Sequence, residues 1–166
     1  MEDSPTDERA FRLLFVCTGN TCRSPMAEAI ARRRAEELGW SHVEVSSAGV
    51  AASWGSPASD GAIRAARGRG LDLSGHTSRG LTESQAQEAD LILTMSPEHL
   101  MRVLELGGGD RAALLTSYAG GHPDGFPATS IPDPIGGPNE EYEATFHLLE
   151  RLIDRVLERL EPVLSK

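Results

Sequence analysis

Short, mainly apolar runs alternate along this chain with longer stretches in which apolar residues recur every three or four positions. The apolar runs are Phe11–Val16, Val43–Ser47, Leu91–Met95 and Ala112–Leu115. Runs of this kind are typical of strands that are buried in a parallel sheet. The alternation of strands with helices predicts a doubly wound α/β sheet. Ligands of such sheets bind at the carboxyl ends of the strands.

Three helices are predicted between these strands, over about 25–38, 58–69 and 97–106. The first follows Ser24-Pro25, which combines an N-cap residue with a proline in the first turn, and Gly39 ends it. The second begins near Ser59, and Ser96-Pro97 opens the third. The residues expected to be buried on the first helix are Ala27, Ile30, Ala31, Ala35 and Leu38.

The C-terminal segment carries the clearest helical pattern. Asn139 is a suitable N-cap, and acidic residues follow it in the first turn. The expected core-facing stripe is Tyr142, Phe146, Leu149, Ile153, Val156, Leu160 and Val163. The preceding segment 116–138 is rich in proline and shows few periodic signals. Because loops of that length are uncommon in compact domains, we expect this one to be functional or mobile.

Composition narrows the class of protein. The chain has 166 residues and a formal net charge of −9, which suits one globular domain and disfavours nucleic-acid binding. No apolar run is long enough to span a bilayer, and the polar, acidic residues 1–10 do not resemble a secretory signal. We therefore expect a disordered tail over 1–10, a domain over 11–166, a cytoplasmic location and no membrane partner.

The segment from Cys17 to Ser24 leaves the end of the first predicted strand and enters a helix. Backbone N–H groups in such a turn form a nest for an anion, and the helix dipole reinforces it. Gly19 and Asn20 are residue types that tolerate a positive φ, which such a ring requires. The segment is no Walker loop, because the GxxxxGK[ST] pattern is absent.

Cys17 and Arg23 stand at the two ends of this segment, with five residues between them. A cation and a helix N-terminus stabilise a thiolate, so we expect Cys17 to be a nucleophile. Arg23 can hold two oxygens of a phosphoryl group, and Ser24 could donate a hydrogen bond to the thiolate. The second cysteine, Cys22, lies too close to Cys17 for a strongly stabilising structural disulfide, which indicates a chemical or redox role.

Phosphoryl transfer also needs a proton for the leaving group. Asp133 is the candidate acid, because it lies in the long loop and Pro132 and Pro134 stiffen it. Taken alone, an Asp-Pro pair is more typical of a turn. Because the chain also carries the phosphate-binding segment 17–24, we interpret Asp133 as the general acid and not as a turn residue.

Taken together, the residues resemble the low-molecular-weight protein tyrosine phosphatase family. The matching features are CTGNTCRSPMAEA over 17–29, Ser47-Ala48-Gly49 after the second strand, and Asp133-Pro134 before the last helix. The resemblance covers about 11–164 and implies a four-stranded parallel sheet with helices on both faces. It also implies a cysteinyl-phosphate intermediate, with no metal and no cofactor.

The resemblance assigns further roles. Cys17 would be the nucleophile, Arg23 the phosphate clamp, and Asp133 the acid that later activates water. The substrate-binding loop would comprise Thr18, Gly19, Asn20, Thr21, Cys22 and Ser24. The network that braces the loop would comprise Asn20, Ser24, Ser47 and His76. Phosphorylated proteins would be the substrates, and phosphate or similar oxyanions would inhibit.

Thr21 distinguishes two branches of the family. Tyrosine-specific members resemble CLGNICRSP, whereas Thr21 followed later by DP-x-GG is similar to the bacterial protein-arginine phosphatases. A small hydroxyl leaves room for a planar guanidinium and could help to position the attacking water. Ile135 replaces an aromatic residue that would stack on a phenyl ring, and it departs from both branches, because the arginine branch often has an aromatic residue there too. The resemblance therefore favours phosphoarginine over phosphotyrosine.

Two other functions fit part of this pattern. The loop is also similar to that of arsenate reductases, which relay electrons through later cysteines, but no cysteine follows Cys22. A non-catalytic anion-binding or redox-sensing module would not need Asp133.

Two single residues also have alternative roles. Cys22 is either structural or a thiol that traps oxidised Cys17 as a disulfide. Trp54 either lines the mouth of the pocket or is an ordinary surface residue.

Overall fold

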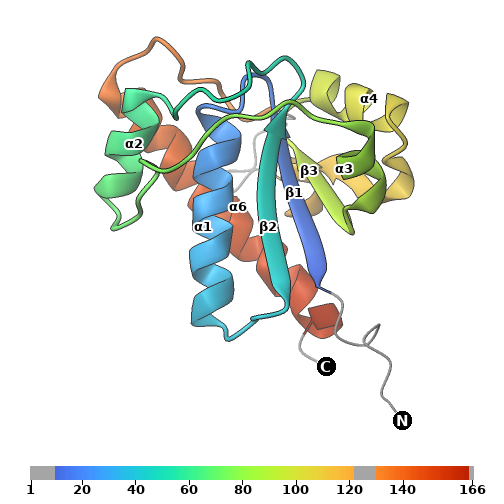
Figure 1. Ribbon diagram of the computed structural model, residues 1–166. Helices are drawn as coiled ribbons and strands as arrows, with labels where there is room; N and C mark the ends of the chain where they lie inside the picture. The colour runs from blue at the N-terminus through green and yellow to red at the C-terminus, as the bar shows by residue number, and fades with distance from the viewer. Residues whose placement is uncertain (1–9, 122–129, 165–166) are drawn as a thin grey trace.

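The computed structural model describes residues 10–121 and 130–164, and a parallel sheet forms its centre (Figure 1). The strands are β1 (Phe11–Cys17), β2 (Val43–Gly49), β3 (Leu91–Thr94) and β4 (Ala112–Leu114). Their order is β2-β1-β3-β4, and every neighbouring pair is parallel. The predicted α/β class and four-stranded sheet are confirmed. The predicted tail lies, except for Ala10, outside the described residues, as does part of the 116–138 loop.

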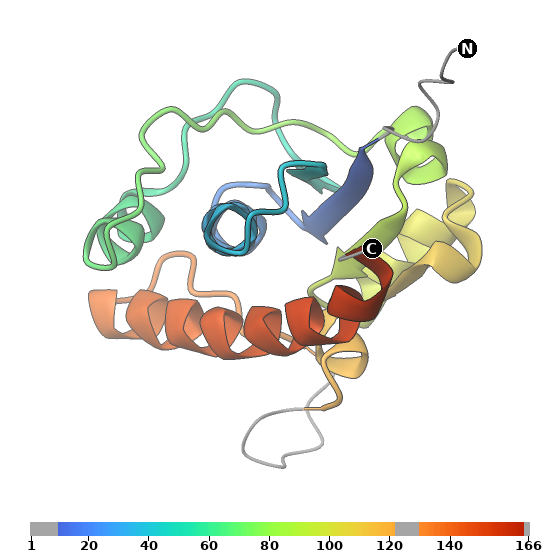
Figure 2. The same cartoon turned by 90° about the horizontal axis from the view of Figure 1, so that it is seen from below.

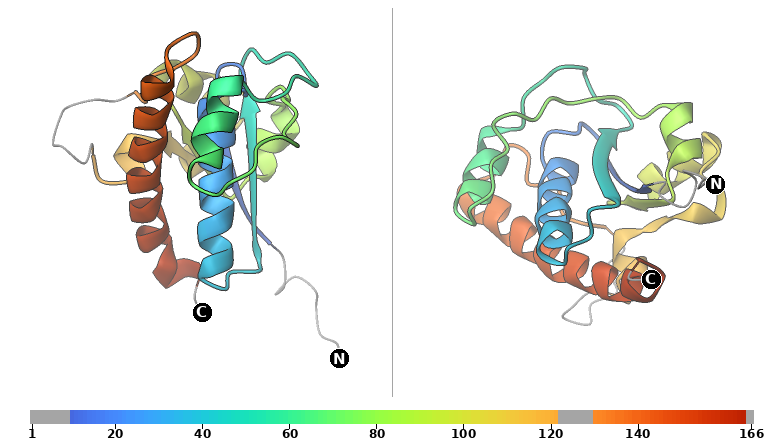
Figure 3. Two further views of the ribbon diagram at one scale, coloured as in Figure 1. Left: turned by 90° about the vertical axis from the view of Figure 1, so that its left-hand side faces the viewer. Right: turned by 60° about the horizontal axis from the view of Figure 1, so that its bottom comes forward.

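Helices cover both faces of the sheet (Figures 2 and 3). One face packs against α1 (Arg23–Glu37) and α6 (Asn139–Leu164), with α5 (Leu115–Tyr118) at its edge, and α2 (Asp60–Arg67) packs against α1 and α6. The other face packs against α3 (Glu83–Glu88) and α4 (Pro97–Glu105). Side chains of β1 alternate between the two faces: Leu13 and Phe15 point to the first, and Leu14 and Val16 to the second.

The strand order places a crevice at the carboxyl end of β1. The chain leaves β1 into α1 on one face of the sheet and leaves β3 into α4 on the other face. Loops that diverge in this way open a binding site at the strand ends. Segments after β1 and β3 therefore meet, and Ile131 joins them because its N–H donates to the carbonyl of Met95 at 2.8 Å.

The start of α1 differs from the prediction. The helix begins at Arg23 with Cys22 as its N-cap residue, so Ser24 lies inside the helix. The Ser24 hydroxyl is already bonded to Cys17 and Asn20, which leaves it unavailable for capping. Leu38, expected in the buried stripe, is 53% exposed because it is the C-cap residue, where the helix ends.

The end of α6 also differs. Val163 is 59% exposed, whereas Leu164 is buried, because the buried face continues four residues beyond Leu160 rather than three. The helix α3, the 3-10 turn Gly109–Arg111 and α5 were not predicted, since each is too short to show a periodic pattern. Within the described ranges, no helix has the length and apolar character needed to cross a membrane.

Candidate active site

The segment Cys17–Arg23 forms a closed ring at the carboxyl end of β1. Asn20 has a φ of +58° and makes the turn, whereas Gly19 does not adopt a positive φ. The loop packs directly on the end of β2, where a Cβ added to Gly49 would lie 2.4 Å from the Thr18 carbonyl oxygen. Only glycine permits that approach. The N–H groups of Val50 and Ala51 donate to the Cys17 and Thr18 carbonyls, both at 2.9 Å.

A buried hydrogen-bond network starts at the Cys17 thiol. The Ser24 hydroxyl lies 2.9 Å from Cys17 Sγ, and Asn20 Nδ2 donates to Ser24 Oγ at 2.9 Å. Because Ser24 accepts from Asn20, its own hydrogen is free to point at the sulfur. The same amide nitrogen donates to Ser47 Oγ at 2.9 Å, and Ser47 donates to Glu28 Oε1 at 2.5 Å.

Glu28 was not predicted as part of this network. It lies within PMAEA, in the first predicted helix, and no role was predicted for it from the sequence. The structure instead pairs its carboxylate with Ser47 and with the Arg32 guanidinium. The spacing of Glu28 and Arg32 predicts an ion pair within the helix, but no local pattern indicated the bond to Ser47, which lies 19 positions away.

Two further residues, His76 and Arg79, form hydrogen bonds with Asn20. His76 Nε2 lies 2.8 Å from the Asn20 carbonyl oxygen, and the Arg79 N–H donates to Asn20 Oδ1 at 2.9 Å. The structure therefore brings together the four residues expected to brace the loop, with His76 acting on the backbone of Asn20. The positive φ of Asn20 is fixed from both sides.

Arg23 joins the ring to the acid segment, Ile131–Gly137. Arg23 is 6% exposed, and its Nη1 donates to the Ile131 carbonyl at 3.0 Å. Nη2 lies 3.5 Å from Asp133 Oδ2 and 3.4 Å from Thr18 Oγ1. The other carboxylate oxygen, Asp133 Oδ1, accepts from the Ile135 N–H at 3.2 Å. Residues 110 positions apart in sequence thus meet at one guanidinium.

Cys22 is a buried free thiol within the ring. Its sulfur lies 3.2 Å from Ser59 Oγ and 3.6 Å from the Tyr142 hydroxyl. Burial raises the pKa of Tyr142, so its phenol stays neutral. Across the described residues, no three His, Cys, Asp or Glu side chains gather as metal ligands would.

Two large apolar side chains in loops at this end of the molecule are exposed. Ile135 follows Asp133-Pro134 and is 61% exposed, and Trp54, in the loop after β2, is 67% exposed. The indole of Trp54 packs over Gly80, where an added Cβ would lie 3.0 Å from its Nε1. Trp54 is therefore held by the segment after His76, and its outer face is open to solvent.

His99 is a buried residue of the site that sequence reasoning missed. It lies in the first turn of α4, with Nε2 2.8 Å from Thr18 Oγ1 and Nδ1 2.9 Å from Ser96 Oγ. Burial and the nearby Arg23 charge lower the pKa of His99 to about 4, so the ring is neutral near pH 7. Ser96-Pro97 indicated only a helix start, and nothing in the sequence placed His99 beside Thr18.

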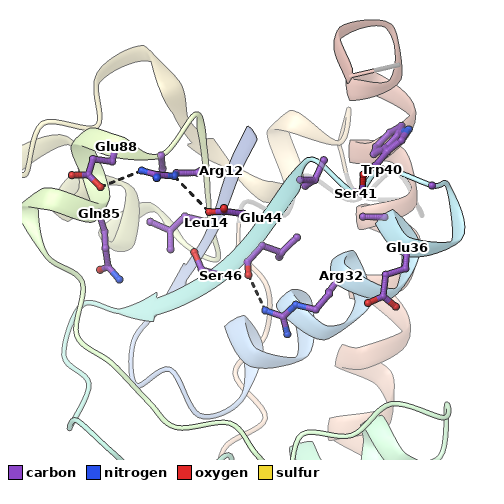
Figure 4. A pocket seen from close by; sticks show the side chains of 15 residues that line it. Arg12, Leu14, Arg32, Glu36, Trp40, Ser41, Glu44, Ser46, Gln85 and Glu88 are labelled. Carbon is purple, nitrogen blue, oxygen red and sulfur yellow. Dashed lines mark hydrogen bonds and ion pairs between the residues drawn. The ribbon is translucent and has the colours of Figure 1, made fainter. Parts of the chain in front are cut away.

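A separate cavity of about 830 Å³ lies along the outer edge of β2 (Figure 4). Residues of α1, β2 and α3 line it, and Arg12 makes ion pairs there with Glu44 and Glu88. None of Cys17, Arg23 and Asp133 lines this cavity. It therefore lies apart from the predicted chemistry.

Relatives of this chain include proteins named as arginine phosphatases and proteins named as tyrosine phosphatases. The chain is 40% identical to a protein-arginine-phosphatase of Geobacillus stearothermophilus over 91% of this chain and 97% of the relative. It is 37% identical to a low-molecular-weight protein-tyrosine-phosphatase of Streptomyces coelicolor over 84% of this chain and 87% of the relative.

Solved structures of both kinds of phosphatase are similar in fold to this chain. A YwlE arginine phosphatase mutant with a phosphorylated active-site serine is 36% identical, with a TM-score of 0.80 over 90% of this chain and 95% of the other. The tyrosine phosphatase Wzb from Escherichia coli K30, in complex with sulphate, is 31% identical, with a TM-score of 0.78 over 91% and 99%. The model of the low-molecular-weight phosphotyrosine protein phosphatase family matches residues 12–165. The chain belongs to that family.

Proposed function

We propose that this protein is a phosphatase that hydrolyses phosphoarginine in proteins through a cysteinyl-phosphate intermediate. The observation that carries the proposal is the closed ring from Cys17 to Arg23. Its thiol lies 2.9 Å from a serine hydroxyl, and its guanidinium contacts the carboxylate of Asp133. A nucleophile, an oxyanion clamp and a proton donor thus converge on one crevice.

In the first step, the Cys17 thiolate attacks phosphorus and the P–N bond to the substrate guanidine breaks. Asp133 gives its proton to the departing nitrogen, and Arg23 holds two of the phosphoryl oxygens. Backbone N–H groups of Thr18, Gly19, Asn20, Thr21, Cys22 and Ser24 would hold the oxygens in the ring. The same groups would bind free phosphate, so phosphate and similar oxyanions should inhibit the enzyme.

In the second step, water attacks the phosphorus and the S–P bond breaks. Asp133, now a carboxylate, takes a proton from that water, so it ends the cycle protonated. The Ser24 hydroxyl donates to the sulfur and stabilises the departing thiolate. The network through Asn20 and Ser47 keeps that hydroxyl turned toward the sulfur.

Substrate choice rests on Thr21 and Ile135. A threonine side chain leaves more room above the ring than a bulky aliphatic one, and its hydroxyl can contact a polar guanidinium or the attacking water. Ile135 offers an apolar wall without an aromatic face. A protein-arginine-phosphatase among the relatives supports this choice. Tyrosine phosphatase activity is the alternative, because another relative bears that name.

Cys22 would protect the nucleophile. Oxidation of Cys17 to a sulfenic acid, followed by attack of the Cys22 thiol, releases water and forms a disulfide that reductants reverse. The buried thiol is held by Ser59 and Tyr142. We expect thiol reductants to restore peroxide-treated wild-type protein but not Cys22→Ser. Equal recovery of both would remove this role.

A reducing compartment suits this chemistry. Both cysteines are free thiols, and such pairs persist in the cytoplasm, where glutathione and thioredoxin keep them reduced. We therefore place the activity there, with phosphorylated proteins as partners and without nucleic acid or membrane. The net charge of −9 agrees with that set of partners.

The substrate proposal is tested by comparing kcat/KM on matched phosphoarginine and phosphotyrosine peptides, for wild type, Thr21→Ile and Thr21→Ser. We expect the wild type to prefer phosphoarginine, Thr21→Ser to keep most of that preference, and Thr21→Ile to lose it. A wild-type preference for phosphotyrosine would assign the protein to the tyrosine branch.

A further inference from the structure

Thr18, directly after the nucleophile, is bonded to a buried histidine from a different part of the fold. Thr18 Oγ1 lies 2.8 Å from His99 Nε2, and His99 Nδ1 lies 2.9 Å from Ser96 Oγ. Ser96 and His99 belong to the junction of β3 with α4, and both are buried. This junction therefore contacts the phosphate-binding ring on the side opposite to the Ser47 network.

The direction of these hydrogen bonds follows from two neighbours: Arg23 donates to Thr18, and the Glu98 carboxylate accepts from Ser96, which leaves Ser96 as an acceptor for His99 Nδ1. A guanidinium only donates, so its Nη2, 3.4 Å from Thr18 Oγ1, leaves the Thr18 hydrogen free to point at His99. Nε2 then accepts, and the proton of the neutral ring resides on Nδ1, which donates to Ser96 Oγ. The Ser96 hydroxyl in turn donates to the Glu98 carboxylate and lowers the pKa of Glu98.

We propose that His99, held by Ser96 as the Nδ1–H tautomer, is a positioning residue that fixes Thr18 and, through Thr18, the Arg23 guanidinium. The inference rests on the proposed function only in taking Arg23 as the phosphate clamp. Neutral His99 agrees with it, since burial and the Arg23 charge both lower the pKa of the ring.

This arrangement gives Arg23 an anchor that does not depend on the acid segment. Its other contacts, to the Ile131 carbonyl and Asp133, come from that segment. Thr18 and His99 instead connect the guanidinium to β1 and α4, which belong to the packed core. The guanidinium would therefore keep one of its anchors if the acid segment moved.

The test is a double-mutant cycle on Thr18→Val and His99→Phe, read as the dissociation constant for inorganic phosphate by titration calorimetry. Both single changes remove the Thr18–His99 hydrogen bond, and Thr18→Val also removes the contact with Arg23, so His99→Phe should weaken phosphate binding by about tenfold and Thr18→Val by at least as much. The double variant should bind no more weakly than Thr18→Val alone, because His99 acts only through Thr18. A loss in the double variant equal to the product of the two single losses would overturn the proposal.

Two further measurements separate positioning from mere packing. His99→Gln keeps an acceptor for Thr18 and should recover most of the affinity, whereas equal loss in His99→Gln and His99→Phe would contradict the role. Nitrogen NMR of the wild type should find the proton of His99 on Nδ1, and a proton on Nε2 would also overturn it. His42→Phe, which alters an exposed histidine, is the control and should bind phosphate like the wild type. Neither measurement requires turnover, so a failure of the phosphoarginine proposal would leave this result unaffected.

Discussion

The two halves of the site are built in different ways. The phosphate-binding ring is buried: Cys17 is 2% exposed, and Asn20 and Ser24 are 0% exposed. The side chain of Asp133 is 41% exposed, and its segment contacts the ring through the 3.5 Å approach to Arg23. The binding half is therefore preorganised, whereas the proton-transfer half lies near solvent, where it can adjust to the substrate.

Replacing the nucleophile should give the largest difference between the effect on kcat and the effect on phosphate affinity. Cys17→Ser should lower kcat on the order of 10⁶-fold, as removal of a covalent nucleophile does in other enzymes. Phosphate should still bind, because the backbone nest and Arg23 remain. Steady-state kinetics and phosphate titration measure the two effects. Substantial residual turnover would assign the nucleophile elsewhere.

Removing the acid affects the exposed half alone. Asp133→Asn should slow the first step by about 10²–10⁴-fold, with the larger losses on substrates whose leaving groups most need a proton. Phosphate affinity should change little. The check is kcat/KM across a series of leaving groups of graded pKa. An equal loss for every leaving group would contradict the acid role.

Each half of the site contains a residue with a positive φ: Asn20 (+58°) in the ring and Gly136 (+78°) in the acid segment. Alanine variants at these two positions therefore allow the two halves to be compared. Asn20→Ala removes the hydrogen bonds to Ser24 and Ser47 and strains the ring, so phosphate binding should weaken by roughly tenfold to a hundredfold. Gly136→Ala meets no atom within 4 Å and should only alter the acid segment. Equal effects on phosphate affinity would remove the contrast between the halves.

The smallest effect is on stability at low pH. His99 has a folded-state pKa of about 4 against 6.5 for the ordinary group, lowered by burial and Arg23 and partly offset by Glu98 and Asp133. The unfolded chain therefore binds the proton first as the pH falls, and unfolding is favoured progressively between about 6.5 and 4. His99→Gln should reduce that dependence in chemical denaturation. An unchanged slope would place the titration on another group.

Local patterns predicted much of this site, and distant contacts account for what was missed. The sheet, the helices and the ring from Cys17 to Arg23 follow from residues that are adjacent in sequence. His99 could not be placed, because it meets Thr18 across 81 positions and only the strand order brings them together. Glu28, on α1, could not be placed either, because its partner Ser47 lies on β2, 19 positions away in the sequence. Leu38 and Val163 were expected to be buried, since periodicity does not show where a helix leaves the core.

The central claim is that Cys17 accepts the phosphoryl group. Its most direct test is to mix the enzyme with a phosphoarginine peptide, quench within one turnover, and map the phosphate by mass spectrometry. We use Asp133→Asn beside the wild type and quench it at times matched to its slower first step, because loss of the base also slows hydrolysis of the intermediate. The account predicts phosphate on Cys17. Phosphate on another residue, or hydrolysis with no covalent intermediate in either protein, would contradict it.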